Sequence, residues 1–367
     1  MKSPISDSAP SEILSKPDWR WQMRNRISSL SELENIISLT DEEKRGISGS
    51  ARVFRWKITP YYASLMNPKD PECPIRKQVV PHEDELLQGC EEYSLDPLEE
   101  LAHSPAKNLI HNYKDRVAFC ISTECPSFCR FCLRKRMVGH SEQNLRPEEY
   151  EEAIQYISSH TEIRDVLLTG GDPLTLGDDT LISLITTLRN IPHVDIIRLG
   201  TRYPVLNPFR ITGELCRRIS ELHPVWINTH FNHPAELTPQ AAEALHTMVD
   251  AGIPVGNQTV LLKGINNDES ILRELFQKLV THRVRPYYLY QSQSIEGTRH
   301  FQTTIEEGME IMEKLRGTLT GFAIPLYVLD TPYGKVPLNP HGYKGRQGNY
   351  VQIRSYSGKI WQEFNPE

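Results

Sequence analysis

The sequence has no apolar run long enough to cross a membrane. A spanning helix needs roughly 20 consecutive, mostly apolar residues, and no run approaching that length occurs among the 367 residues. The opening Met1 to Ser8 is polar and no apolar segment follows it, so we expect no secretory signal peptide. These absences predict a cytoplasmic protein without membrane contacts.

Positive charge is not in excess either. The 41 lysines and arginines are outnumbered by 47 aspartates and glutamates, which gives a net charge of −6. Because nucleic-acid-binding domains are usually basic, we expect no nucleic-acid partner. The local exception is the run Arg130, Arg134, Lys135 and Arg136, which we interpret either as a solvated face or as an anion site.

Cysteine is scarce, but it is concentrated. The chain has 7 cysteines, and this odd number suits a reducing cytosol better than a disulfide framework. Cys125, Cys129 and Cys132 form a Cys-x3-Cys-x2-Cys run. Three thiolates leave a four-iron cluster one ligand short, so its fourth iron is open. The alternative is zinc, whose structural sites take four ligands, with His140 as the fourth. We favour the iron–sulfur cluster.

The N-terminal part predicts helices without a repeat. A helical pattern extends from Asp18 to about Ser48, and Thr40 begins one helix because acidic residues fill the following turn. We expect residues 1–110 to form a helical region that packs on the following domain.

From about residue 117 the pattern changes to short β-branched runs that alternate with amphipathic segments. The expected strands are Val117–Ile121, Val166–Thr169, Ile196–Gly200, Val225–His230, Val255–Leu262, Arg285–Tyr290 and Ala323–Leu329. The expected helices are 147–159, 178–190, 209–222, 237–251, 268–281 and 303–317. Such alternation indicates an α/β fold with a parallel sheet, closed into a full or partial barrel. We assign residues 111–340 to it and 341–367 to a short tail.

The ends of these strands carry the candidate site, because barrel active sites form where strands end. The cysteine run follows the first strand. Gly170 and Gly171 follow the second, and we expect them to admit a ligand and to leave backbone amides free to donate. Lys335 follows a glycine just beyond the last strand. It is either a surface residue or the Schiff-base lysine of a pyridoxal phosphate site.

The chain resembles the lysine 2,3-aminomutase family of pyridoxal-phosphate-dependent radical S-adenosylmethionine enzymes, from about residue 59 to about residue 340. The markers are Thr59-Pro-Tyr-Tyr, Asp115-Arg-Val, the cysteine run with Arg134-Lys-Arg, Asp165-Val-Leu-Leu-Thr-Gly-Gly-Asp, Pro224-Val-Trp-Ile-Asn-Thr-His-Phe-Asn-His-Pro, Gly256-Asn-Gln, Arg283-Val-Arg-Pro-Tyr-Tyr and the Lys335 loop. The resemblance implies a partial (βα)6 TIM-like barrel of the radical S-adenosylmethionine type.

It also implies which residues hold the cofactors. The ligands of a 4Fe-4S cluster would be Cys125, Cys129 and Cys132. The residues near S-adenosylmethionine would be Gly170, Gly171, Asp172, His230 and Gln258. Pyridoxal 5'-phosphate would be held as an internal aldimine on Lys335, with Arg116 at its phosphate and Tyr113 and Tyr290 near its ring.

The implied reaction moves the α-amino group of a free amino acid to its β-carbon through a 5'-deoxyadenosyl radical. Arg134 would pair with the substrate α-carboxylate, since arginine binds carboxylates through two hydrogen bonds. A reductant such as flavodoxin or ferredoxin would supply the electron.

Two residues are expected to contact the distal end of the substrate side chain. Asp330 matches one of two family aspartates that hold the lysine ammonium, but Gln293 occupies the place of the other. We expect L-lysine, with β-lysine as the product. Arginine is the alternative, because an amide beside a carboxylate suits the donors of a guanidinium. Glutamate is less favoured, because Asp330 would repel its side chain.

Three further positions separate this chain from the family pattern. Phe131 and Asn112 replace a polar residue and an arginine that some relatives carry near the cofactors. Asp268 replaces a zinc-binding cysteine, and no cysteine follows Cys216, so we predict no zinc. A homodimer is the default, since two-fold assemblies are commonest. A catalytically inactive metal-binding protein would have lost a cysteine or Lys335, and neither is lost.

Overall fold

The computed structural model describes residues 16–87, 93–138, 145–339, 342–355 and 357–364. His140, the alternative fourth zinc ligand, lies outside these ranges. No helix in the described segments combines the length and apolar character that a membrane crossing requires.

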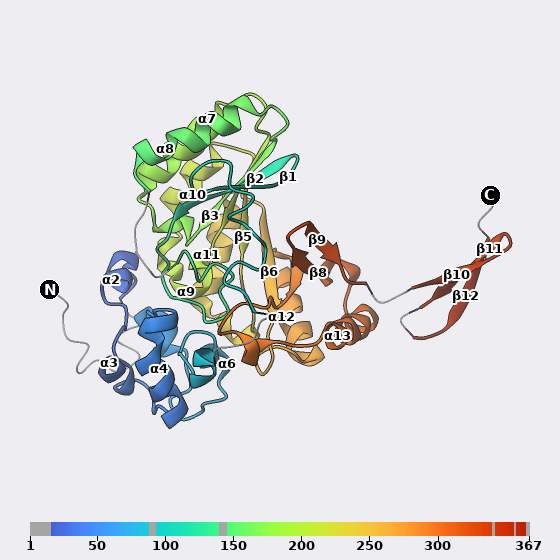
Figure 1. The fold of residues 1–367 in the computed structure, drawn as a ribbon, viewed down its shortest axis with the longest axis horizontal. Coiled ribbons are helices and arrows are strands. Elements are labelled where there is room, and N and C mark those ends of the chain that lie inside the picture. The colour runs from blue at the N-terminus through green and yellow to red at the C-terminus, as the bar shows by residue number, and fades with distance from the viewer. Residues whose placement is uncertain (1–15, 88–92, 139–144, 340–341, 356, 365–367) are drawn as a thin grey trace.

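Short helices make up the N-terminal region, as predicted, and lie against one side of the sheet (Figure 1). They are α2 (Trp19–Arg24), α3 (Leu30–Glu34), α4 (Asp41–Val53), α5 (Pro60–Ser64), α6 (Pro74–Lys77) and the 3-10 turn η1 (Glu83–Leu86). Helix α4 begins where the sequence predicts: the Thr40 side chain accepts from the Glu43 amide, and Glu43 accepts from the Thr40 amide.

Within the described residues, nine strands form one sheet in sequential order. They are β1 (Leu109–Tyr113), β2 (Arg116–Ser122), β3 (Asp165–Gly170), β4 (Ile196–Gly200), β5 (Val225–Thr229), β6 (Val255–Leu261), β7 (Arg285–Gln291), β8 (Leu326–Thr331) and β9 (Gly334–Pro337). Neighbours from β2 to β8 are parallel, whereas β1 and β9 pair antiparallel at the two edges. The predicted α/β barrel fold is confirmed.

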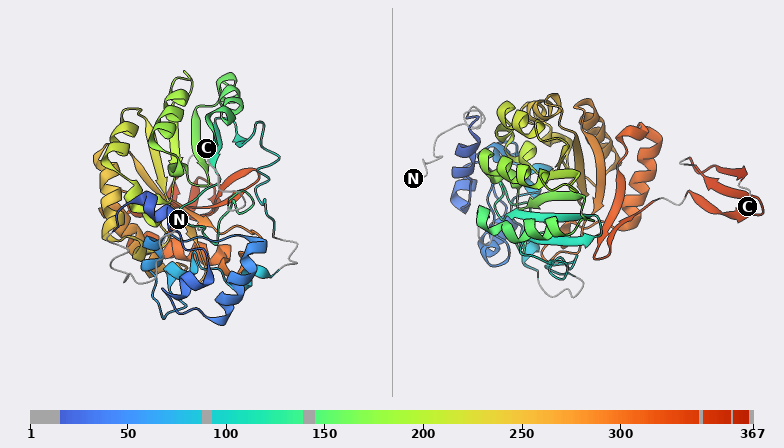
Figure 2. Two further views of the ribbon diagram at one scale, coloured as in Figure 1. Left: turned by 90° about the vertical axis from the view of Figure 1, so that its left-hand side faces the viewer. Right: turned by 90° about the horizontal axis from the view of Figure 1, so that it is seen from above.

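Helices cover the outer side of this sheet (Figure 2). They are α7 (Glu151–Ser159), α8 (Asp178–Arg189), α9 (Tyr203–Leu206), α10 (Gly213–Ser220), α11 (Pro239–Asp250), α12 (Glu269–Thr281) and α13 (Ile305–Thr318). The 3-10 turns are η2 (Pro147–Glu149), η3 (Pro173–Thr175), η4 (Pro208–Arg210), η5 (Pro234–Glu236), η6 (Arg299–Phe301) and η7 (Gly321–Ala323). Helix α10 starts later than predicted because Thr212 caps it, accepting from the Leu215 amide.

Alternation along each strand separates the core from the interior of the barrel. On β3, Val166 and Leu168 are fully buried in the apolar core, whereas Leu167 and Thr169 line a cavity on the other side of the sheet. Successive side chains of a strand point to opposite faces, so one short segment serves both packing and the site.

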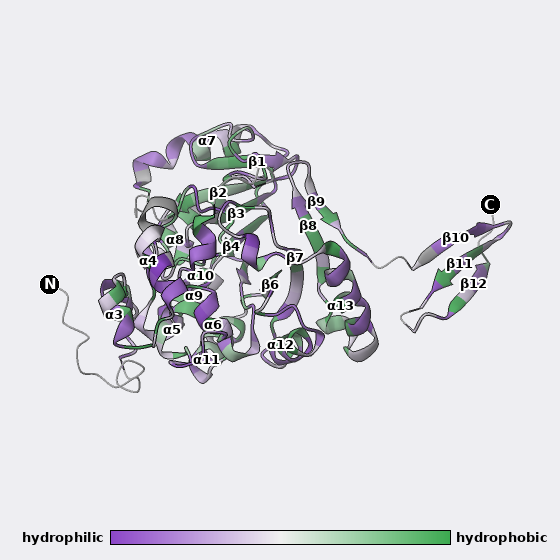
Figure 3. Ribbon diagram, turned by 60° about the horizontal axis from the view of Figure 1, so that its bottom comes forward, coloured by the Kyte–Doolittle hydropathy of each residue, from purple (hydrophilic) through white to green (hydrophobic). Residues whose placement is uncertain are grey.

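The C-terminal residues form a separate element that the sequence does not predict. Strands β10 (Tyr343–Gln347), β11 (Tyr350–Arg354) and β12 (Ile360–Phe364) make a three-stranded antiparallel sheet. It extends away from the barrel (Figure 1), and its hydrophobic residues lie on β11 and β12 whereas β10 is hydrophilic (Figure 3). Arg354 pairs with Glu313 of α13 at 2.5 Å. The division at residues 110 and 340 stays a prediction.

Candidate active site

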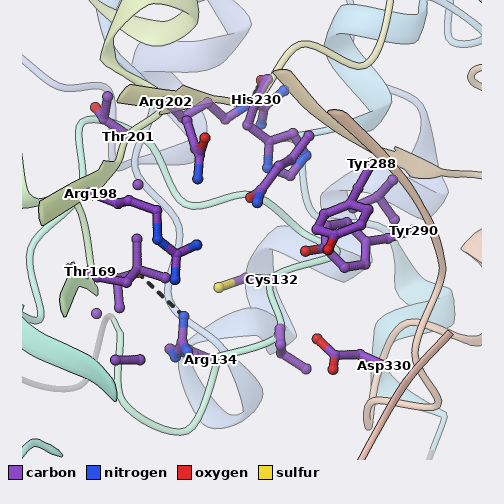
Figure 4. Close-up of a pocket in the computed structure, with 18 of the residues that line it drawn as sticks. Cys132, Arg134, Thr169, Arg198, Thr201, Arg202, His230, Tyr288, Tyr290 and Asp330 are labelled. Carbon is purple, nitrogen blue, oxygen red and sulfur yellow. Dashed lines mark hydrogen bonds between the residues drawn. The ribbon is translucent and has the colours of Figure 1, made fainter. Parts of the chain in front are cut away.

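A cavity of about 840 Å³ lies inside the curved sheet, and every predicted site residue lines it. The cysteine loop follows β2, the glycine pair ends β3, and the β8–β9 hairpin contributes the lysine. In Figure 4, Cys132 lies between the strand residues Thr169 and Arg198 and the group formed by Tyr288, Tyr290 and Asp330. The fold therefore brings the candidate cluster and the candidate Schiff-base lysine into one chamber.

The N-terminal helical region holds the cysteine loop in shape. Arg26 donates to the Cys125 carbonyl at 2.7 Å and pairs with Glu124 at 3.0 Å. The backbone amides of Phe128 and Arg130 donate to the carbonyls of residues 57 and 78, at 3.1 Å and 2.8 Å. The loop is thus part of the packed core and is not a surface loop.

The basic run that follows is paired inside the protein. The Arg130 guanidinium is fully buried and donates to both oxygens of Glu85, the shortest bond being 2.6 Å. Lys135 lies 3.8 Å from the same carboxylate, and burial lowers its pKa to about 8. Both interpretations of the run, a solvated face and an anion site, are therefore wrong for these two residues.

Glu100 holds the other half of the run. Its two oxygens accept from Arg134 and Arg136, each at 2.8 Å, and Asp96 pairs with Arg136 at 3.3 Å. Arg134 also donates to Thr169 at 3.4 Å (Figure 4), and its buried Nε has no hydrogen-bond partner. Of the four basic residues, Arg134 is the one that lines the cavity.

The three thiols fit an iron–sulfur cluster. Burial raises the pKa of Cys125 well above its ordinary value and that of Cys132 to about 11. Buried thiols of this kind become thiolates when a metal supplies positive charge. Three soft donors on one loop suit a four-iron cluster that leaves one iron open.

Arg202 is a site residue that the sequence did not reveal. Its guanidinium donates to the Cys129 sulfur at 2.7 Å and to Glu236 at 2.7 Å. It also donates to Gln78 at 2.5 Å. Its position just after β4, at the mouth of the barrel, is the signal that could have identified it.

The glycine pair packs against the cysteine loop. A Cβ on Gly171 would lie 2.3 Å from the Glu124 carbonyl oxygen. The Gly171 amide donates to the Ser122 carbonyl at 2.5 Å, and the Asp172 amide donates to the Glu124 carbonyl at 2.8 Å. The prediction of an amide free to donate to a ligand is therefore wrong for Gly171, because the neighbouring loop uses it; for the Gly170 amide it stays a prediction.

The Asp172 carboxylate is likewise engaged within the protein. It accepts from the Thr201 hydroxyl and the Arg202 amide, both at 2.7 Å, and from the Leu174 amide at 3.1 Å. Burial raises its pKa to about 6. Asp172 lines the cavity, but its hydrogen bonds organise the loops after β3 and β4.

His230, Gln258 and the unpredicted Asn228 line the cavity beside the cluster loop. Burial and the nearby Arg202 charge lower the pKa of His230 to about 3, so it is a neutral imidazole. The buried Asn228 side-chain nitrogen has no hydrogen-bond partner in the protein. Such an orphaned donor fits a polar ligand, as S-adenosylmethionine would be.

The opposite part of the cavity is built on the β8–β9 hairpin. Asp330 and Lys335 are directly opposed across it, and their side chains form an ion pair of 2.9 Å. The Lys335 Nζ lies 5.7 Å from the ring centroids of both Tyr113 and Tyr290. An amine between two rings fits a Schiff base to an aromatic aldehyde.

Gln293 lies beside Asp330 and donates from its side-chain amide to the Asp330 backbone carbonyl at 2.8 Å. Arg116 stacks on the Tyr113 ring with its guanidinium carbon 3.7 Å from the centroid, and it donates to Asp115 at 2.8 Å. The structure therefore brings the predicted distal-pocket residues together and places a cation near the lysine.

Phe131 and Asn112, which differ from the family pattern, also line the cavity. Phe131 packs against the His230 ring with centroids 5.7 Å apart and lies 5.3 Å from the Arg202 guanidinium, so it shields that charge. Asn112 directly precedes Tyr113 on β1. Asp268 instead caps α12, accepting from the Ser270 amide at 2.8 Å; the absence of zinc stays a prediction.

Residues 119–275 match the family model of the radical SAM superfamily. An L-lysine 2,3-aminomutase from Clostridium subterminale is 45% identical over 95% of this chain and 84% of that protein. The chain belongs to the lysine 2,3-aminomutase family. A glutamate 2,3-aminomutase from Clostridioides difficile is also 45% identical, over 94% of this chain and 82% of that protein. Overall identity therefore does not choose the substrate.

Among solved structures, a radical SAM methyltransferase from Sphaerobacter thermophilus aligns with a TM-score of 0.46 and 17% identity, covering 60% of this chain and 68% of that one. Lysine 2,3-aminomutases are isomerases that depend on a 4Fe-4S cluster, S-adenosylmethionine and pyridoxal phosphate. Enzymes of the superfamily also take a substrate and an electron donor.

Proposed function

We propose that this protein converts free L-lysine into β-lysine by moving the amino group from C2 to C3. The observation that carries the proposal is the Asp330 carboxylate, which holds an ammonium group 2.9 Å away inside the cavity that the three cysteines line. In the structure that ammonium belongs to Lys335. This pairing supports a cationic group as the partner of Asp330 in this part of the cavity.

The cofactor assignments follow from the residues that line the cavity. Cys125, Cys129 and Cys132 would bind the cluster, and Lys335 would bind pyridoxal phosphate, with Arg116 at the phosphate. When bound, the reduced cluster and S-adenosylmethionine supply hydrogen-atom abstraction, and pyridoxal phosphate supplies a carbonyl that carries the migrating amino group.

Arg134 would hold the α-carboxylate of the substrate. Its Nε is buried and unpartnered, and a charged donor of this kind gains most from a carboxylate. Glu100 fixes the other side of the guanidinium, so the free donor has a defined direction.

The distal end of the cavity selects a cation. The Gln293 amide nitrogen is used by the Asp330 carbonyl, so its oxygen is the atom left to face a ligand. The Asp330 carboxylate and this amide oxygen are both acceptors. A lysine ammonium supplies the matching donors, whereas the carboxylate of a glutamate side chain would meet an uncompensated negative charge.

Arginine is the second candidate, and Gln293 is the specific observation in its favour. A guanidinium has five donors and spreads its charge over a plane, so one carboxylate with a neutral acceptor suits it. We also propose that flavodoxin or ferredoxin delivers the electron, that the active form is a homodimer, and that no nucleic acid takes part.

The test is anaerobic reconstitution with iron, sulfide and pyridoxal phosphate, followed by S-adenosylmethionine, dithionite and L-lysine, L-arginine or L-glutamate in separate reactions. Chromatography with mass spectrometry should detect β-lysine as the main product. The matched control is Lys335→Ala, which should still release 5'-deoxyadenosine but form no β-isomer. Release of 5'-deoxyadenosine by the wild type, with no isomer of any of the three, would refute the proposal.

A further inference from the structure

One side chain connects the two edges of the barrel sheet. The strand order begins at β1 and ends at β9, and no ladder between these two strands occurs among the described residues. The backbone amide of Lys335, on the edge strand β9, donates to the Tyr113 hydroxyl at 2.7 Å. Edge-strand amides lack a strand partner, and here a tyrosine at the end of β1 takes that place.

The local structure of β1 points Tyr113 toward this edge. Pairing with β2 shifts register between Ile110 and Tyr113, as a β-bulge produces. Bulges reorient the side chains that follow them. The backbone of β1 therefore determines where the Tyr113 hydroxyl lies.

Gly334 makes the approach of the ring possible. It has a φ of +108°, and a Cβ at this position would lie 3.0 Å from both the Cε1 atom and the hydroxyl oxygen of Tyr113. Only glycine adopts this conformation without strain. The hairpin and the ring therefore fit together through a residue that has no side chain, immediately before Lys335.

The same ring also contacts Arg116, whose guanidinium carbon lies 3.7 Å from the ring centroid. Tyr113 and Arg116 are directly opposed in the β1–β2 pair. Tyr113 thus touches the backbone of the residue proposed to bind the aldehyde of pyridoxal phosphate and the side chain of the residue proposed to bind its phosphate.

We infer that Tyr113 is a positioning residue that sets the span between the Lys335 amine and the Arg116 guanidinium. Its hydroxyl fixes the backbone of Lys335, and its ring fixes the plane of Arg116. This inference rests on the proposed function, in which these two residues anchor the cofactor. In this role the Tyr113 hydroxyl is required to accept from the Lys335 amide, whereas packing of the ring alone would not require a hydroxyl.

The test uses the full-length protein titrated with pyridoxal phosphate, reduced with borohydride and digested. Peptide mass spectrometry then gives the fraction of Lys335 that carries a pyridoxyl group. Tyr113→Phe removes the acceptor and keeps the ring, so we expect about 5-fold to 10-fold more cofactor for half-maximal labelling, the effect of one hydrogen bond. Tyr333→Phe, on the same hairpin and 97% exposed, is the matched control and should behave as wild type.

A second probe separates the two contacts. Pyridoxal, which lacks the phosphate, should lose as much labelling as pyridoxal phosphate in Tyr113→Phe, because the hydroxyl acts at the amine. Tyr113→Leu also frees Arg116, so it should weaken labelling by pyridoxal phosphate more than labelling by pyridoxal. A general loss of structure would weaken labelling by pyridoxal phosphate and labelling by pyridoxal equally in every variant. Thermal unfolding of each variant measures such a loss.

The outcomes distinguish the inference from the proposed function. If wild-type Lys335 is not labelled, the proposed function fails. If wild type is labelled and Tyr113→Phe matches it, the positioning role is refuted and the lysine assignment stands. If Tyr113→Phe is weakened only in proportion to lost folded protein, the role is also refuted.

Discussion

The two ends of the cavity are built differently. At the cluster end, the arginines that hold the cysteine loop are buried: Arg130 is 0% exposed and Arg202 is 6% exposed. At the lysine end, the side chains of Lys335 and Asp330 are 28% and 15% exposed. The first end is braced by residues from the N-terminal region and three strand ends, whereas the second is built on the β8–β9 hairpin with side chains of β1, β2 and β7 around it.

Because of this difference, we expect the cluster end to be rigid and the lysine end to be adaptable. A cluster and its partner cofactor need a geometry fixed by surrounding hydrogen bonds. In the proposed function, the hairpin end meets the variable part of the substrate, and its side chains are less deeply buried than those at the cluster end. Substrate choice can therefore change without loss of the radical chemistry, which fits relatives of equal identity named for lysine and for glutamate.

The largest effect is expected at the cluster. Cys132→Ser removes one of three soft ligands, and we expect iron bound after reconstitution to fall to the level of unreconstituted protein, with loss of activity. Iron and sulfide analysis measures this result. Cys216→Ala, at a buried cysteine away from the cavity, should retain its iron. Full iron retention in Cys132→Ser would contradict the ligand assignment.

The next prediction compares an arginine from each end. Arg130→Met leaves Glu85 buried with its main partner removed, so the free energy of unfolding should fall by about 3–5 kcal/mol. Arg116→Met breaks an ion pair that is 36% exposed on the arginine side and should change stability by less than about 1 kcal/mol. Urea unfolding measures both. Equal effects would remove the contrast between the two ends.

Lys135 predicts a pH dependence at the cluster end. Burial lowers its pKa from 10.5 to about 8, so the protonated form destabilises the folded state below pH 8. That penalty, about 3 kcal/mol, disappears as the pH rises from about 8 to 10.5. Lys135→Met should therefore be more stable than wild type at pH 7, by an amount that shrinks toward pH 10.5. If the difference in stability between Lys135→Met and wild type does not depend on pH, or if the exposed Lys69→Met shows the same difference, the lowered pKa of Lys135 is not its cause.

The smallest expected effect concerns the substrate end. Gln293→Asp adds a second carboxylate beside Asp330, so the ratio of kcat/KM for lysine over arginine should rise about 10-fold, which corresponds to about 1.4 kcal/mol. Gln293→Asn keeps the charge unchanged and is the matched control. A ratio that stays the same or moves toward arginine would show that Gln293 does not contribute to the distal pocket.

Much of the barrel could be predicted because its signals are local. The alternation of β-branched runs and amphipathic segments appears in short windows, and each of the seven expected strands has a counterpart, β2 to β8. The cysteine run and Lys335 were also recognisable, because the chemistry of these residues depends on their own side chains and on close spacing. Every residue expected in the site consequently lines the cavity, although Arg202 and Asn228, which also line it, were not expected.

The tertiary structure alone decided how these residues are held. Arg130 pairs with Glu85 across 45 positions of the chain, and Arg202 reaches Gln78 across 124. No short pattern encodes such partners, because they depend on which segments the fold brings together. For the same reason, Arg130 and Lys135 of the basic run proved to be paired inside the protein, and the Gly171 amide proved to be bonded to a neighbouring loop. The contact between Tyr113 and Lys335 likewise depends on the two edges of the sheet coming together.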